Sequence, residues 1–303
     1  MGPERAIRKL LVGVDGKGHA VHAAAMNARR FDARIELLHA VPVPPALWIG
    51  IDKKMLAEMH QSALAEAEGV VRERLGQLEL DTGLDPGELT ERLVVLPGEP
   101  GKELIDRSRE TSPDFLFLGT HRERGAFELG RTARAVLAGA HCGVWLQPSP
   151  YEAVERVIAT VDLSPHDDVA LETARNLARL LGARLAVLHC FQAPTVAYAG
   201  EEATVLGWPR YELASLRRRV RSEFDERMEA FDWHGTEVER IFVEGDPVEE
   251  ILNRLDPAQL LVMGTHGHTG LSGFVLGHVT WSVLKRAEAP VLAVRKPGRT
   301  WLI

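Results

Sequence analysis

The chain is a series of short apolar segments separated by longer amphipathic ones. The apolar segments, such as residues 10–14 and 157–161, lack strict polar alternation, which is typical of strands covered on both faces. The longer segments carry apolar residues at helical spacing, as in the stripe of Val21, Ala24, Ala25 and Ala28. Alternation of this kind predicts an α/β fold with parallel sheets and helices on both faces.

Local signals place several helix boundaries. In the second half, Pro165 and Asp167 are expected to open a helix that Gly182 closes. Two longer, highly charged helices are expected at about residues 52–76 and 211–231. Each half of the chain is therefore predicted to contain five strands and about four helices.

The sequence repeats itself at a period near half its length, which predicts two domains of the same fold. The proline-rich stretch around residues 148–150 marks the seam, because proline cannot extend a central strand. The predicted domains are residues 1–149 and 150–303, each a doubly wound, parallel five-stranded sheet. Segments 10–15, 37–39, 93–100 and 118–121 correspond to segments 157–162, 187–189, 241–247 and 263–266.

The most informative segment is GTHGHTGLSGFVLGHVT, residues 264–280, which follows an apolar run. Glycines after a strand let the backbone approach a ligand, and the N–H groups at the start of the next helix suit phosphate. The segment is neither a Walker A loop nor the dinucleotide fingerprint. On glycine content alone, a turn without a ligand is an equal alternative.

The glycine spacing Gly264-x2-Gly267-x9-Gly277 resembles the ATP-binding signature of the universal stress protein family. Asp162 at the end of one apolar run, Leu188-His189 at the end of the next and the segment 289–292 also resemble that family. The resemblance covers nearly the whole chain, so the sequence is identified as a tandem universal stress protein. It implies an internal pseudo-dimer in which the last strands of the two halves pair, and a homodimer of such chains remains open.

The resemblance also implies a nucleotide site in the second half. ATP, ADP or AMP is the expected ligand, with no metal beyond the Mg²⁺ that accompanies ATP. Asp162 and its strand end would face the adenosine, the backbone at Cys190 the adenine edge, and Met263 and Gly264 the ribose. One position departs from the family pattern, because His278 stands where Ser or Thr is usual. The implied residues are Thr160, Asp162, Cys190, Met263, Gly264, Gly267, Gly277, His278, Val279 and, as a substitute hydroxyl, Thr280.

The first half departs further from the pattern. Arg122 replaces the middle glycine, and the interval from Gly119 to Gly130 is two residues shorter than its counterpart. A side chain at Arg122 obstructs close approach if the backbone there needs a positive φ. The standard site is expected to be lost in this half, although Asp15 is retained and leaves adenosine-type binding open.

Composition narrows the remaining classes. A net charge of −7 argues against nucleic-acid or membrane-surface binding, and two cysteines suit a reducing cytosol. The first ten residues lack the apolar core of a signal peptide, so a cytoplasmic location is expected. His266, His268 and His278 share a loop without cysteine, so no metal site is predicted. Neither catalytic residues nor an activated nucleophile is evident.

The sequence therefore predicts a stress protein that binds adenine nucleotide and acts through conformation and protein partners rather than turnover. Two alternatives remain open. One is an interaction or chaperone-like module without nucleotide, and the other is an enzyme, such as a weak ATPase. The long loops that contain Trp48, Tyr198 and Trp208 are candidates for lids over a ligand, with ordinary packing of these aromatic residues as the alternative.

Overall fold

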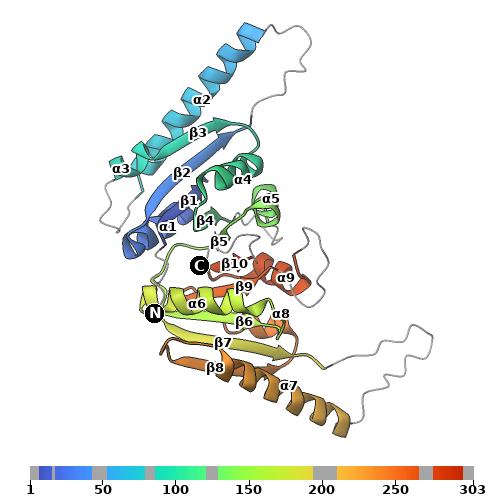
Figure 1. Cartoon of the computed structure of the whole chain (residues 1–303). Helices are drawn as coiled ribbons and strands as arrows, with labels where there is room; N and C mark the ends of the chain where they lie inside the picture. Colours follow the sequence, from blue (N-terminus) through green and yellow to red (C-terminus); the bar gives the residue numbers. More distant parts are fainter. Residues whose placement is uncertain are drawn as a thin grey trace, which may run out of the picture.

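A computed structural model of the chain describes residues 7–15, 18–42, 53–78, 86–120, 129–193, 210–265 and 276–295. The loops with Trp48, Tyr198 and Trp208, together with Arg122 and the middle of the 264–280 segment, lie outside these residues. Figure 1 shows the two halves stacked end to end, with the long helices α2 and α7 at opposite ends of the molecule.

The first half alternates strands and helices as expected. Its strands are β1 (Lys9–Gly13), β2 (Arg34–Val41), β3 (Leu93–Pro97), β4 (Phe115–Gly119) and β5 (Gly143–Gln147). Its helices are α1 (His19–Phe31), α2 (Lys53–Gly76), α3 (Pro86–Glu91), α4 (Pro100–Thr111) and α5 (Arg131–Gly139).

The second half repeats this order without a counterpart of the short helix α3 among its described residues. Its strands are β6 (Arg156–Val161), β7 (Arg184–Phe191), β8 (Val238–Glu244), β9 (Gln259–Gly264) and β10 (Val291–Val294). Its helices are α6 (Asp167–Leu181), α7 (Arg210–Ala230), α8 (Pro247–Leu252) and α9 (His278–Arg286).

The strands form one continuous ten-stranded sheet in the order β3-β2-β1-β4-β5-β10-β9-β6-β7-β8. Every neighbouring pair is parallel except β5 and β10, which pair antiparallel with Trp145 opposite Leu292. The two predicted five-stranded parallel sheets are therefore confirmed, and they join edge to edge through their last strands, as the family resemblance implied.

Helices cover both faces of this sheet, which explains the unbroken apolar runs of the inner strands. One hydrophobic cluster packs α1, α2, α6 and α7 on one face, and the other packs α4, α5, α8 and α9 on the opposite face. The predicted stripe of α1 faces the first cluster, and so does an apolar stripe of α6 that includes Ala170, Ala174 and Leu177. Gly182 ends α6 in a left-handed conformation (φ 62°), which confirms the predicted C-terminus of that helix.

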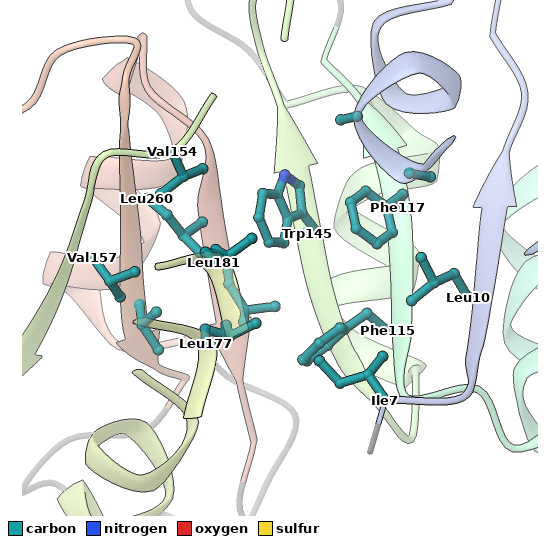
Figure 2. Close-up of a cluster of buried hydrophobic side chains, with 14 of the residues drawn as sticks. Ile7, Leu10, Phe115, Phe117, Trp145, Val154, Val157, Leu177, Leu181 and Leu260 are labelled. Atoms are coloured by element: carbon teal, nitrogen blue, oxygen red, sulfur yellow. The ribbon is translucent and has the colours of Figure 1, made fainter. Parts of the chain in front are cut away.

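The junction between the halves is packed as a protein core. Figure 2 shows Trp145 between Phe117 of the first half and side chains of the second half that include Leu260. The Trp145 and Phe117 rings stack with centroids 4.9 Å apart, and the indole N–H donates to Gln147. A guanidinium N–H of Arg30 also donates to the carbonyl of Leu181 across the junction. The two halves thus share one core.

Candidate functional site

In the second half, three elements meet at the carboxyl edge of the sheet, where open α/β sheets bind ligands. Strand β9 ends at Gly264, and helix α9 begins after Gly277, which has no side chain that could cap the helix. The hydroxyl of the buried Thr280 donates to the carbonyl of Gly264 at 2.9 Å, and the Gly277 N–H donates to the carbonyl of Thr265. These bonds fix the start of α9 beside the end of β9.

The start of α9 supplies the chemistry that suits an anion. The first N–H groups of a helix lack partners within the helix, and the helix dipole adds partial positive charge there. His278 is the first helical residue and is exposed, with Val279 half-buried behind it. Helix α9 therefore begins directly after Gly277, the third glycine of the family spacing.

Asp162 stands directly after β6, the strand that pairs with β9. Its carboxylate accepts a hydrogen bond from the backbone N–H of Ser164 at 3.0 Å, which closes a tight turn. Leu163 between them adopts a left-handed conformation with φ 65°, uncommon for a non-glycine residue. This turn holds the Asp162 side chain close to the strand end.

A second carboxylate lies beside the first. Asp167, the first residue of α6, is 7% exposed and accepts a hydrogen bond from the Asp162 N–H at 3.2 Å. Burial, and after it the negative charge of Asp162, together raise the pKa of Asp167 from 3.8 to about 7. The sequence pattern predicted Asp167 only as a residue that opens a helix.

The end of strand β7 completes this edge. His189 is buried, and its Nδ1 lies 3.0 Å from the carbonyl of Val161 while its ring stacks on Phe224. These contacts give His189 the structural role that its recurrence in both halves suggested. Cys190 follows, partly buried, with Thr160 and the buried Met263 on neighbouring strands. Gly267, His266 and His268 lie outside the described residues.

The first half keeps the carboxylate at the equivalent strand end. Asp15 follows β1, and one of its carboxylate oxygens accepts the N–H of Gly18 at 3.1 Å. The other oxygen lies so close to Gly119 that a Cβ there would stand 2.0 Å from it. Glycine at position 119 therefore leaves the space that the Asp15 side chain occupies at the end of β4.

A cavity of about 460 Å³ opens beside Asp15. Asp15 and His39 form its polar edge at the ends of β1 and β2, and helix α2 forms the far wall. The volume falls within the range of small-molecule sites. The lining residues among those described are Val14, Asp15, Gly18, Val21, His39, Val71, Arg74, Leu75, Gln77 and Leu78.

The second half fills the corresponding space with aromatic side chains. Each long helix buries two side chains four residues apart, Val71 and Leu75 on α2 but Phe224 and Met228 on α7. Opposite the two strand-end histidines, β3 places a valine, whereas β8 places Phe242. His189 stacks against both phenylalanines, at 5.9 Å and 5.5 Å between centroids. Val71 and Leu75 line the cavity in the first half, whereas the second half carries the larger Phe224 at the place of Val71.

Comparisons with known proteins give the family. The model of the universal stress protein family matches twice, over residues 6–148 and 153–295. The chain belongs to the universal stress protein family. Universal stress proteins of Mycobacterium tuberculosis and Mycolicibacterium smegmatis are 24% and 28% identical to it over 305 residues each. The alignments cover 95% and 94% of this chain and 96% of each relative.

The fold comparison agrees with this result. The crystal structure of a universal stress protein from Archaeoglobus fulgidus superposes with a TM-score of 0.59 at 17% identity, covering 96% of this chain and 99% of that one. The present chain is therefore a tandem of two copies of the family fold, as the sequence predicted.

Burial raises the pKa of both cysteine thiols, Cys142 and Cys190, to about 12, so neither forms a thiolate at neutral pH. Over the part of the chain that the structure describes, no three His, Cys, Asp or Glu side chains are grouped to hold a metal ion. Within the same residues, no helix combines the length and the apolar character needed to span a membrane.

Proposed function

We propose that the second half of this universal stress protein binds an adenine nucleotide, ATP or one of its hydrolysis products. One observation carries the proposal: Asp162, the end of β9 and the start of α9 lie together at the carboxyl edge of the sheet. The carboxylate suits the hydroxyl and amino groups of adenosine, and the helix N-terminus suits phosphate. Residues 1–149 and 150–303 are proposed as the two domains, with the site in the second.

The proposed contacts follow the strand ends. Asp162 and Thr160 would face adenosine, the Cys190 backbone the adenine edge, and Met263 and Gly264 the ribose. Gly267, Gly277, His278 and Val279 would surround the phosphates. Thr280 has a supporting role in this arrangement, because its hydroxyl proton is directed to the Gly264 carbonyl.

Two solved universal stress proteins are in complex with cAMP and with dAMP. Each aligns with about half of this chain, 48% and 47%, at TM-scores of 0.32 and 0.31. The proposal for this chain therefore rests on its own residues and on its family. We further propose that the nucleotide is held rather than turned over, and that it acts by changing how the protein engages partners in a cytoplasmic stress response.

The proposal predicts that purified protein releases ATP, ADP or AMP when it is denatured, as identified by mass spectrometry. Asp162→Ala is expected to weaken added ATP about 10- to 100-fold, since a hydrogen bond to a charged group is worth roughly 1.5–3 kcal/mol. Gly277→Val is expected to abolish binding, because its branched side chain would stand at the helix start. Calorimetric titration measures both effects.

The matched control is Gly130→Val in the first half. Gly130 precedes α5 with nearly the same backbone angles as Gly277 before α9, φ −56° in both cases. A Cβ at Gly130 meets nothing within 4 Å. This variant should keep the nucleotide. No released nucleotide and no thermal shift with ATP would instead favour the alternative of a nucleotide-free interaction module.

The cavity in the first half supports a second candidate function. We propose that it takes an adenosine-type ligand without the usual phosphate grip, with Asp15 accepting hydrogen bonds at the cavity edge. The apolar side chains Val14, Val21 and Leu75 suit a flat ring, and ligand sites are commonly apolar with a few convergent polar groups.

Filling this cavity gives a direct test. Val71→Phe places on α2 the side chain type that α7 carries at Phe224, and it is expected to abolish adenosine binding to the first half. Binding is measured in the Gly277→Val background, so that the second half is silent. Val70→Phe is the matched control, because Val70 is 41% exposed on the same helix. Equal adenosine affinity in both variants would rule out this cavity as the site.

A further inference from the structure

The turn after β6 brings two carboxyl groups together in a buried place. Asp167 is 7% exposed, and it lies next to Asp162, whose backbone N–H donates to the Asp167 carboxyl. One Asp167 oxygen accepts the Asp162 N–H, whereas the other receives no hydrogen bond within the described part of the chain. A buried carboxylate oxygen without a hydrogen-bond partner disfavours the charged form, and the negative charge of Asp162 does the same, so this arrangement favours a proton on Asp167.

The surroundings do little to neutralise a second negative charge. From the neighbouring helix α7, Arg227 acts on Asp167, but its guanidinium is paired with Asp168 at 2.8 Å. On the near side of α6, His166 precedes Asp167 and its buried Nδ1 has no hydrogen-bond partner among the described residues. Asp162 therefore remains the dominant charged neighbour of Asp167.

The turn couples the two groups mechanically. Only four residues lie between Asp162 and Asp167, and the Asp162 carboxylate accepts the Ser164 N–H. Leu163 must keep its left-handed conformation for that bond to form. A change in the charge of Asp167 thus acts directly on the position of the Asp162 side chain.

We propose that Asp167 is a positioning residue that carries the proton of this pair, so that the second half binds its adenine nucleotide more tightly below neutral pH than above it. The inference rests on the nucleotide site proposed above. Protonated Asp167 carries no charge, so it repels neither the Asp162 carboxyl nor the phosphates of the ligand. Ionised Asp167 instead repels both Asp162 and the phosphates of the ligand.

The test is the affinity for ATP between pH 5.8 and pH 8.5, measured by calorimetric titration on the full chain. The wild type is expected to lose about 10-fold more affinity than Asp167→Asn across this range, since one pKa unit corresponds to a factor of ten. The amide of Asn keeps an acceptor for the Asp162 N–H and offers N–H donors to its carboxylate. Ionisation of ATP itself affects both proteins equally, so it cancels when the affinity of the wild type is divided by that of Asp167→Asn at each pH.

Asp225→Asn is the control, because Asp225 lies on α7 in an exposed pair with Arg221. It should follow the wild-type profile. Identical pH profiles for wild type and Asp167→Asn would overturn the inference while leaving nucleotide binding intact. No ATP binding to the wild type at any pH would overturn the proposed nucleotide function itself.

A measurement without ligand distinguishes failure of the inference about Asp167 from failure of the proposed nucleotide function. The infrared difference spectrum between wild type and Asp167→Asn should show the C=O stretch of a protonated carboxylic acid at pH 5.8, and this band should vanish by pH 8.5. Its presence supports Asp167 as the proton carrier whether or not ATP binds. Its absence at pH 5.8 overturns that role.

Discussion

Trp145→Ala is expected to lower the free energy of unfolding by about 3–5 kcal/mol, the usual cost of truncating a fully buried tryptophan to alanine. Trp145 is 0% exposed and stacks on Phe117. It also lies on β5, opposite Leu292 of β10, where the two halves join. Its removal therefore opens a cavity in the core that both halves share.

Urea denaturation followed by circular dichroism measures this loss. The wild type is expected to unfold in one transition, whereas the truncated variant separates the unfolding of the two halves because their common core is weakened. Trp145→Phe is the control, since it retains an aromatic ring against Phe117; it loses the bond to Gln147, about 1 kcal/mol, and part of the buried ring, and should cost less than Trp145→Ala. A loss below about 1 kcal/mol for Trp145→Ala would contradict the shared core.

Much of this architecture could be predicted from the sequence because it depends on local pattern and repetition. The apolar stripe of α6 and the glycine at its end determine that helix almost completely. The long charged helices were expected at residues 52–76 and 211–231 and occur at Lys53–Gly76 and Arg210–Ala230. The pairing of β5 with β10 followed from the family resemblance and not from any local signal.

The cavity of the first half could not be predicted in the same way. It depends on which side chains of α2 pack beside His39, and helix packing decides this. A signal was nevertheless present. Val71 and Phe224 occupy like places on two repeated helices, and a comparison of the repeats at buried positions would have revealed the difference in size.

The carboxyl pair was missed for another reason. Asp at the first turn of a helix is ordinarily explained by the helix dipole, and Asp167 fits that pattern. What brings it to Asp162 is the left-handed Leu163, a conformation that sequence statistics disfavour for leucine. Strained turns of this kind cluster at functional sites, so an observed outlier is more informative than the propensity it violates.

Asp167→Asn is expected to stabilise the protein at alkaline pH. The folded state holds the pKa of Asp167 at about 7, above its ordinary value of 3.8, chiefly because the carboxyl is buried. A carboxyl with a raised pKa contributes most stability below the unfolded pKa and loses it as pH rises through the folded one. Wild-type stability should therefore fall between about pH 4 and pH 7 and then level off, whereas the variant lacks this component.

Three pKa units correspond to about 4 kcal/mol, so the variant should exceed the wild type by roughly 2–4 kcal/mol at pH 8 and match it within about 1 kcal/mol at pH 4. Urea titrations at both pH values measure the difference. Asp225→Asn again serves as the control and should show no such dependence. A variant less stable than the wild type at pH 8 would mean that the ionised Asp167 is stabilised, and the proton would then belong to neither carboxyl. A gain confined to alkaline pH would instead show that the fold maintains Asp167 against its own charge, as expected of a group kept for binding rather than for stability.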